Sequence, residues 1–183
     1  MTDRQIRVTP TDELARGRLE GITELCVAAF GEPPEALWEG IGPGLHVIAE
    51  VGARPVAHAM VVDRTLYIGD DAVVSIDAGY VELVATRPEL QSHGHATAVM
   101  RTVGTLIAEE YVLGALATGS NSFYERLGWE TWSGPTAVRM PDGERVRSAA
   151  EDGHVMILRT SRTPSSLAVT MPISVDWRPG DPW

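Results

Sequence analysis

The sequence has few of the residues that would place it in several common classes of protein. Its 183 residues include one cysteine, Cys26, so an internal disulfide is excluded. No apolar run approaches the roughly 20 residues of a membrane-spanning helix. The first ten residues, MTDRQIRVTP, lack the apolar segment of a signal peptide. There is no internal repeat and no low-complexity tract. We therefore expect a single domain over residues 1–183, in the cytoplasm and away from membranes.

Negative charge dominates the ionisable residues. The formal net charge is −10 at pH 7, which argues against nucleic acid or an anionic membrane as a partner. It is compatible with a polycationic substrate, and also with solubility alone. Cys26 stands in the apolar stretch LCVAAF, where we expect a buried structural thiol rather than a nucleophile.

Alternation and helical periodicity divide the chain into strands and helices. Thr11 and Asp12 are residue types that cap helices, so the first helix is predicted to begin there. It is predicted to end before the two prolines at 33 and 34. A turn is expected at 69–71, and an edge position is predicted for the last strand because it contains Pro172. The predicted strands cover 6–10, 45–51, 55–63, 66–68, 70–76, 80–86, 111–118, 129–132, 137–140, 154–160 and 167–177; the predicted helices cover 11–30, 35–39, 96–110 and 120–127. The fold class is therefore α/β, with a sheet of mixed direction and one parallel strand-helix-strand crossover.

A short turn between the strand 80–86 and the helix 96–110 organises this prediction. It reads QSHGHA from Gln91 to Ala96 and has small residues at its fourth and sixth positions. A turn of this kind before a helix presents unpaired N–H groups to an anion, and the helix dipole favours negative charge there. The turn predicts a phosphate-binding loop, although an ordinary strand-to-helix turn also fits it.

Four stretches together resemble a known family. They are GYVELVAT, the QSHGHA turn, YVLGAL followed by FYERLGW, and the terminal DWRPGDPW. This set is similar to the aminoglycoside 2'-N-acetyltransferases, a branch of the GNAT superfamily. The resemblance implies a GNAT fold, with a mixed, mostly antiparallel sheet and splayed parallel strands that form an acetyl-CoA site. It also implies a homodimer, an aminoglycoside or similar polyamine sugar as substrate, and antibiotic resistance.

The resemblance implies direct attack of an amine on the thioester, with Glu82 and Tyr124 as the catalytic residues. Glu82 shares a strand face with Tyr80 and could take the proton of the attacking amine, directly or through a water. The phenol of Tyr124 would protonate the departing thiolate, a step that water could also perform. The alternatives are a solvated or salt-bridged glutamate and a tyrosine of the core.

The same resemblance assigns the cofactor contacts. Main-chain groups of Val84, Ala85 and Thr86 would pair with the pantetheine arm as an added strand does. The pyrophosphate would lie on the amides of Gln91, Ser92, His93, Gly94, His95 and Ala96. Gln91 stands where the family usually has an arginine, so the loop has one cation fewer. No metal is expected, because two histidines at i and i+2 with no third ligand make a poor zinc site.

Several carboxylates are needed to bind a substrate with several ammonium groups. Further contacts implied by the resemblance come from Leu83, from the hydroxyl of Thr118 and from Trp183, whose carboxylate would end the chain. The stretch Glu151-Asp152-Gly153 is equally typical of a hairpin turn. The alternative for the C-terminal residues 176–183 is disorder. The candidate carboxylates are Glu32, Glu82, Glu151, Asp152 and Asp181.

Two alternatives remain open. One is a GNAT enzyme that acts on another small amine or on a peptide N-terminus. The other is a coenzyme A-binding GNAT-like module without catalysis.

Overall fold

The structure, a computed structural model, describes residues 4–70 and 73–183, and its contacts separate into two compact units. The first unit comprises Met1–Val62 and Val81–Thr105, and the second comprises Asp63–Tyr80 and Leu106–Trp183. Neither unit is a continuous stretch of chain. Strands β3 (Arg54–Ile68) and β4 (Val74–Thr86) and helix α3 (His95–Glu110) each pass from one unit into the other. The single domain stays a prediction.

Antiparallel strands form the sheet of the first unit. β1 (Arg4–Pro10) pairs with β2 (Leu45–Val51) along its whole length, and β2 pairs with β3 through a tight turn. Gly52 provides the left-handed residue of that turn, with φ 67°. The first three strands therefore follow the hairpin pattern that the alternating sequence predicts.

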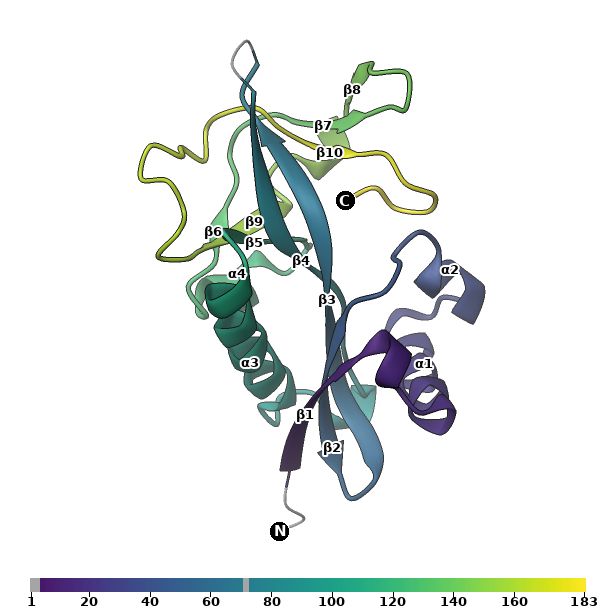
Figure 1. The fold of residues 1–183 in the computed structure, drawn as a ribbon. Coiled ribbons are helices and arrows are strands. Elements are labelled where there is room, and N and C mark those ends of the chain that lie inside the picture. The colour runs from purple at the N-terminus through teal and green to yellow at the C-terminus, as the bar shows by residue number, and fades with distance from the viewer. Residues whose placement is uncertain (1–3, 71–72) are drawn as a thin grey trace. The chain divides into compact units, whose positions relative to one another are not determined.

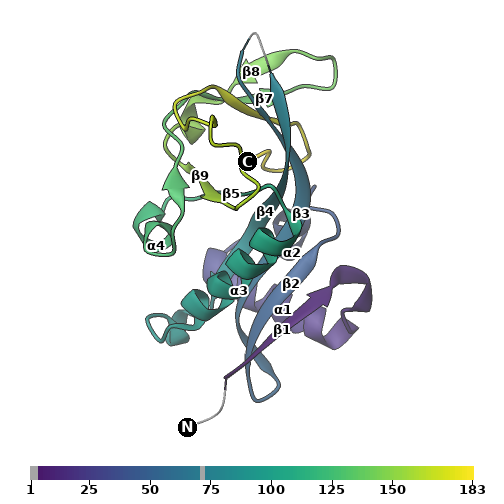
Figure 2. The same ribbon diagram turned by 60° about the vertical axis from the view of Figure 1, so that its left-hand side comes forward.

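Helices cover both faces of this sheet. α1 (Arg16–Phe30) and α2 (Pro34–Trp38) lie on one side, and the first part of α3 lies on the other (Figures 1 and 2). α1 directs Ile22, Leu25 and Cys26 into a core where all three are fully buried. Burial raises the pKa of the Cys26 thiol to about 12. This confirms the prediction of a buried structural cysteine.

The prediction that the first helix begins at Thr11 is wrong. Residues Thr11–Glu13 form a single 3-10 turn, and α1 begins at Arg16. The Thr11 hydroxyl accepts a hydrogen bond from the Gly44 N–H at 2.9 Å and lies 3.1 Å from His46 Nε2. It is therefore bound to the next strand instead of capping the helix.

The second unit contains the parallel strand pair of the crossover. β4 and β5 (Leu113–Ala117) are parallel, with Ala78 opposite Leu113, and the chain between them forms α3. The strand order is β6-β9-β5-β4-β3-β10-β7-β8. The remaining elements are α4 (Asn121–Glu125), β6 (Glu130–Thr131), β7 (Thr136–Arg139), β8 (Arg145–Arg147), β9 (Val155–Arg159) and β10 (Ile173–Asp176).

Close packing explains one glycine of the family-like GYVELVAT stretch. A Cβ added to Gly79 would lie 2.7 Å from the Tyr111 ring, so no larger residue fits there without a shift. The fully buried Trp132 packs in the same unit and donates from Nε1 to the carbonyl of Met171 at 2.8 Å.

Some boundaries differ from the sequence predictions. The separate strands predicted at 55–63 and 66–68 are one strand, and so are those at 70–76 and 80–86, as far as the described residues reach. The turn at 69–71 lies partly outside the described residues. The edge position predicted for the last strand is wrong, because β10 lies between β3 and β7. Pro172 directly precedes β10, so it removes no donor from that ladder.

Ser120 precedes α4 as predicted, but its side chain makes no capping hydrogen bond. Within residues 4–70 and 73–183, no helix has the length and apolar character needed to cross a membrane.

Candidate active site

The loop before α3 has the backbone geometry of an anion site. Ser92 and Gly94 both adopt left-handed conformations, with φ of 63° and 74°. The N–H of Ala98 donates to the carbonyl of Gly94 in the first bond of the helix. The amides of residues 95–97 precede that bond, so they have no acceptor within the helix. These amides and the positive end of the helix dipole suit a phosphate group.

A cation that the sequence did not reveal lies beside this loop. Arg4, on β1, donates from Nη1 to the Gly94 carbonyl at 3.1 Å. Burial, Arg4 and His93 together lower the pKa of His95. Arg4 therefore places positive charge next to the loop in which Gln91 replaces the family's usual arginine.

Two buried polar atoms lie on the segments that the sequence assigns to the cofactor. Among the described residues, Thr86 Oγ1 and His95 Nδ1 are buried without a hydrogen-bond partner. Such atoms are costly unless a ligand or water completes them. Thr86 ends β4 and His95 begins α3, so both segments fit an extended ligand that carries phosphates.

Glu82 and Leu83 lie next to each other on β4. Glu82 is half-buried, and its Oε1 atom is buried. Leu83 has φ 50°, a left-handed conformation that costs a residue with a side chain about 1–2 kcal/mol. The Leu83 carbonyl lies 3.0 Å from Nδ1 of His58. The backbone of β4 is therefore distorted immediately beside the proposed base.

Two fully buried histidines lie behind Leu83. His46 Nδ1 lies 3.0 Å from His58 Nε2, with the rings 5.2 Å apart. Burial lowers the pKa of His46 to about 4. Burial and the neighbouring His46 lower the pKa of His58 to about 3. Both rings are therefore neutral near pH 7.

This pair predicts a loss of stability in mild acid. A histidine that titrates near pH 6.5 when unfolded and lower when folded contributes fully above 6.5 and loses its contribution as the pH falls. With two such groups, the free energy of unfolding should fall by up to about 2–3 kcal/mol per pH unit below pH 6. Urea titrations at pH 7.5, 6.0 and 5.5 measure this slope. His58→Asn should remove about half of it, and a flat profile in the wild-type protein would contradict the pKa shifts.

A pocket of about 600 Å³ lies in the first unit, between α1, α2 and β2. Glu20, Glu24, Trp38 and His46 are among its lining residues. The indole of Trp38 donates to Thr23 Oγ1 at 3.2 Å, which fixes one wall. Glu32, a predicted substrate carboxylate, is exposed just beyond the end of α1 and does not line this pocket.

Tyr124 lies in the second unit, on α4. It is 7% exposed and packs edge-on against Phe123 and Trp129. Burial raises its pKa to about 12, against a smaller lowering by a hydrogen bond with Thr118. The structure thus brings the predicted general acid and the predicted hydroxyl contact, Thr118, together.

The second unit also holds an acidic pair. Burial and the charge of Asp181 raise the pKa of Glu151, while His154 opposes the change. The two carboxylates are therefore close enough to repel each other. A bound cation would relieve that repulsion.

Asp152 is engaged differently from its neighbour Glu151. Arg147 donates to both of its carboxylate oxygens, and the backbone N–H and hydroxyl of Thr136 donate to Oδ1 at 3.0 Å. The Arg147 guanidinium is the main cause that lowers the pKa of Asp152 to about 2. A substrate cation would have to compete with an arginine already in place.

The C-terminal residues are docked and not disordered. Trp183 is 4% exposed, and its Nε1 donates to Ser148 Oγ at 2.9 Å. Its backbone N–H donates to Asp181 Oδ1 at 3.0 Å. This turn holds the Asp181 carboxylate at the backbone of Trp183, whose indole anchors the tail to Ser148.

Comparisons with known proteins decide the family. The family model described as an acetyltransferase (GNAT) domain matches residues 11–132, two thirds of the chain. The chain belongs to the GNAT superfamily of acetyltransferases. The predicted GNAT fold and acetyl-CoA cofactor are thereby confirmed. The cofactor contacts of the loop at 91–96 and of the segment Val84–Thr86 stay predictions.

A curated relative extends the match over nearly the whole sequence. The chain is 35% identical over 182 residues to the aminoglycoside 2'-N-acetyltransferase of Mycolicibacterium fortuitum, covering 97% of this chain and 91% of the relative. This confirms the resemblance inferred from the four sequence stretches.

Solved structures share the fold at lower identity. The GNAT family N-acetyltransferase YhbS of Escherichia coli, in complex with CoA, has a TM-score of 0.66 and 12% identity over 96% of this chain and 91% of its own. Eis1 of Mycobacterium abscessus has a TM-score of 0.57 and 19% identity over 74% of this chain. This chain spans only 32% of Eis1, and it likewise spans about a third of two other structures that it matches.

Proposed function

We propose that this protein transfers the acetyl group of acetyl-CoA to the 2'-amino group of an aminoglycoside. The observation that carries the proposal is the full-length similarity to a 2'-N-acetyltransferase. The acidic pair of Glu151 and Asp181 supports it, because a polyamine sugar carries several ammonium groups. Acetylation removes one positive charge and adds bulk, so the drug would bind its RNA target less well. Antibiotic resistance is the proposed outcome.

The first unit would bind the cofactor and supply the base. The amides of residues 91–96 bind the pyrophosphate, with Arg4 as the adjacent cation, and the main chain of Val84–Thr86 orients the pantetheine arm. Acetyl-CoA supplies an activated thioester. Glu82 accepts the proton of the attacking amine, directly or through water.

Tyr124 in the second unit would stabilise the departing sulfur. An ordinary thiol has a pKa near 8.5, about 3.5 units below that of Tyr124, so full proton transfer from this phenol to a thiolate is unfavourable. A hydrogen bond from the phenol still stabilises the negative charge. Because the thiol pKa lies above neutral pH, the released thiolate takes up a proton from the solvent, which balances the proton that the amine has lost.

Glu151 and Asp181 would bind ammonium groups of the sugar, and Asp152 would hold the loop that carries Glu151. Thr118, Leu83 and Glu32 stay candidate contacts. The homodimer and the cytoplasmic location also belong to this proposal and rest on the resemblance alone. Sedimentation velocity of the purified protein tests whether it is a homodimer.

A panel of acceptors tests the proposal. Coenzyme A release should be fast with aminoglycosides that carry a 2'-amine, and close to background with matched analogues that carry a 2'-hydroxyl. Equal activity on both would favour another position on the sugar. Activity only on simple amines or peptide N-termini, or none on any amine, would contradict the proposal.

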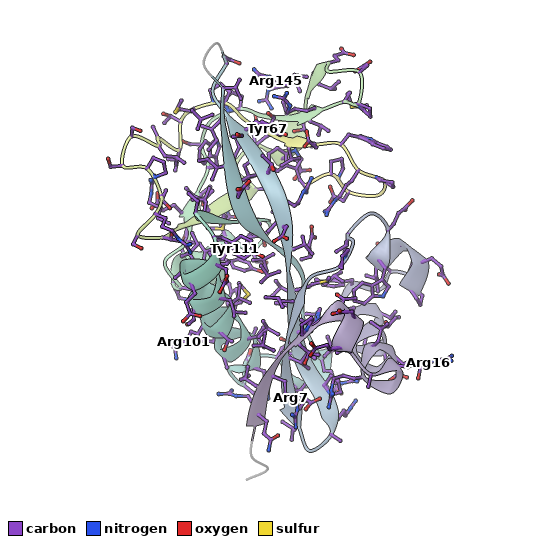
Figure 3. All side chains as sticks on the ribbon, viewed as in Figure 1. Arg7, Arg16, Tyr67, Arg101, Tyr111 and Arg145 are labelled. Atoms are coloured by element: carbon purple, nitrogen blue, oxygen red, sulfur yellow. The ribbon has the colours of Figure 1, made fainter. Side chains whose placement is uncertain are left out.

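Arg4 provides a separate test of the cofactor site. Arg4→Gln should raise the KM for acetyl-CoA about 10-fold, the range of a partly exposed charge-assisted hydrogen bond, with kcat nearly unchanged. Steady-state kinetics at low and high salt measure the effect, which should shrink as salt screens the charge. Arg16→Gln is a matched control, because Arg16 lines the pocket beside α1 and not the loop at 91–96, and its side chain, 92% exposed, pairs with Glu20 of the same helix (Figure 3). An unchanged KM in the Arg4 variant would remove this arginine from the site.

A further inference from the structure

The left-handed peptide at Leu83 separates two groups that the proposed function uses. Glu82, the proposed base, precedes it, and the main chain of Val84, assigned to the cofactor, follows it. A leucine rarely adopts φ 50° unless surrounding contacts hold it there. The directions of the Glu82 side chain and the Val84 amide both depend on how that peptide is held.

A side chain of the neighbouring strand β3 holds it. His58 is fully buried, and its Nδ1 lies 3.0 Å from the Leu83 carbonyl oxygen. A carbonyl only accepts hydrogen bonds, so Nδ1 of His58 must carry the proton. Because the ring is neutral near pH 7, its Nε2 is then an acceptor.

His46 fixes that tautomer. His46 Nδ1 lies 3.0 Å from His58 Nε2, so it must be the donor, and His46 Nε2 becomes an acceptor. The Thr11 hydroxyl lies 3.1 Å from His46 Nε2 and 3.0 Å from the Gly44 carbonyl, so its hydrogen has two acceptors within reach. The Thr11 oxygen also accepts from the Gly44 N–H at 2.9 Å. The hydrogen bonds from His46 to His58 and from His58 to Leu83 therefore both point toward Leu83.

The last acceptor of this series, the Leu83 carbonyl, determines the function that the histidines can have. An amide carbonyl takes up no proton near neutral pH, so these groups cannot carry a proton to or from the reaction. They can only fix an orientation.

We propose that His58 is a positioning residue for acetyl transfer, which holds the Leu83 peptide so that Glu82 and the Val84 main chain face the reacting groups. The hydrogen bond from His46 keeps Nε2 of His58 an acceptor, and this fixes the tautomer that lets His58 donate. The inference rests on the proposed roles of Glu82 and of the β4 main chain. It assigns functions to two residues that the family resemblance did not mark.

Two variants of His58 test the inference by kcat. His58→Leu removes the donor, whereas His58→Asn keeps an N–H donor near the position of Nδ1. We expect His58→Leu to lower kcat about 10- to 100-fold and His58→Asn to stay within about 3-fold of the wild-type value. The assay uses the amine with the highest turnover in the acceptor panel. The effect of His58 on kcat can therefore be measured even if the preferred amine is not the 2'-amino group of an aminoglycoside.

Two further measurements separate positioning from general damage to the fold. Calorimetric binding of coenzyme A should change less than about 3-fold in both variants, because the phosphate loop is left intact. Two-bond ¹⁵N–¹H correlation spectra of the wild-type histidine rings should show protonated Nδ1 and unprotonated Nε2 in His46 and His58. This readout remains decisive if His58→Leu fails to fold.

Three results would overturn the inference. The first is wild-type kcat in a folded His58→Leu protein. The second is equal loss of coenzyme A binding in the Leu and Asn variants, which would make the ring a support of the fold alone. The third is a spectrum with protonated Nε2 on His58.

Discussion

Glu82→Gln is expected to lower kcat about 10²- to 10⁴-fold, the usual range for removing a general base. The amide has nearly the shape of the carboxylate but cannot accept the proton of an ammonium. Because the cofactor contacts proposed for this region use main-chain groups, the KM for acetyl-CoA should change little. Steady-state rates of coenzyme A release, with each substrate varied in turn, measure both constants.

Glu13→Gln is a control for the loss of one negative charge. Glu13 is exposed in the 3-10 turn of the first unit, so its substitution should leave kcat unchanged. Wild-type turnover in the Glu82 variant would remove this residue from the mechanism. A large rise in the KM for the sugar with unchanged kcat would make Glu82 a binding residue instead.

Glu151→Gln combined with Asp181→Asn should raise the KM for the aminoglycoside at least about 100-fold, with little effect on kcat. Each lost contact is a hydrogen bond between charged groups, worth about 1.5–3 kcal/mol, and 1.4 kcal/mol corresponds to tenfold. The amide oxygen that replaces the carboxylate of Asp181 can still accept from the Trp183 N–H, so the tail should stay docked. Removing residues 181–183 altogether would also take away the buried indole, which makes the double substitution the cleaner test.

A matched variant controls for the change in net charge. Asp142→Asn with Glu144→Gln removes the same number of carboxylates from an exposed turn of the second unit. It should bind the sugar as the wild-type protein does, apart from a small long-range effect that salt screens. If both double variants weaken binding equally, the acidic pair has no specific role.

The central elements could be predicted from sequence because their patterns are local. The periodicity of residues 96–110 predicts α3 to within one residue of its observed start, and the apolar run after it predicts the parallel strand β5. Glycine in the QSHGHA turn predicts a left-handed residue before the helix. Positive φ at Ser92 was not predictable, because serine shows no preference for it.

Contacts between distant segments could not be predicted in this way. Arg4 reaches the Gly94 carbonyl across 90 positions of sequence, and no local pattern links the two. Asp152 is one of the predicted substrate carboxylates, but Arg147, on a strand that the sequence did not predict, occupies its carboxylate. A turn signal such as Asp-Gly does not show which side chain will meet the carboxylate.

The histidine pair could not be placed from the predicted strands alone. An uninterrupted register from the turn between β2 and β3 would pair His46 with Ala59, but the register shifts between Ala49 and Glu50 and so places His46 opposite Met60 and His58 opposite Ile48. This irregularity makes the two histidines diagonal neighbours on one face of the sheet. The contact of His58 with the Leu83 carbonyl was not predictable either, because it depends on an unusual backbone conformation of a third strand.

The position of the acetyl group in the product tests the central claim most directly. The protein is incubated with acetyl-CoA and an aminoglycoside that carries several amines, and the product is purified and assigned by two-dimensional NMR. We predict a single acetyl group, on the 2' nitrogen, with one coenzyme A released per sugar. Acetylation at any other nitrogen, or coenzyme A released without an acetylated sugar, would contradict the account.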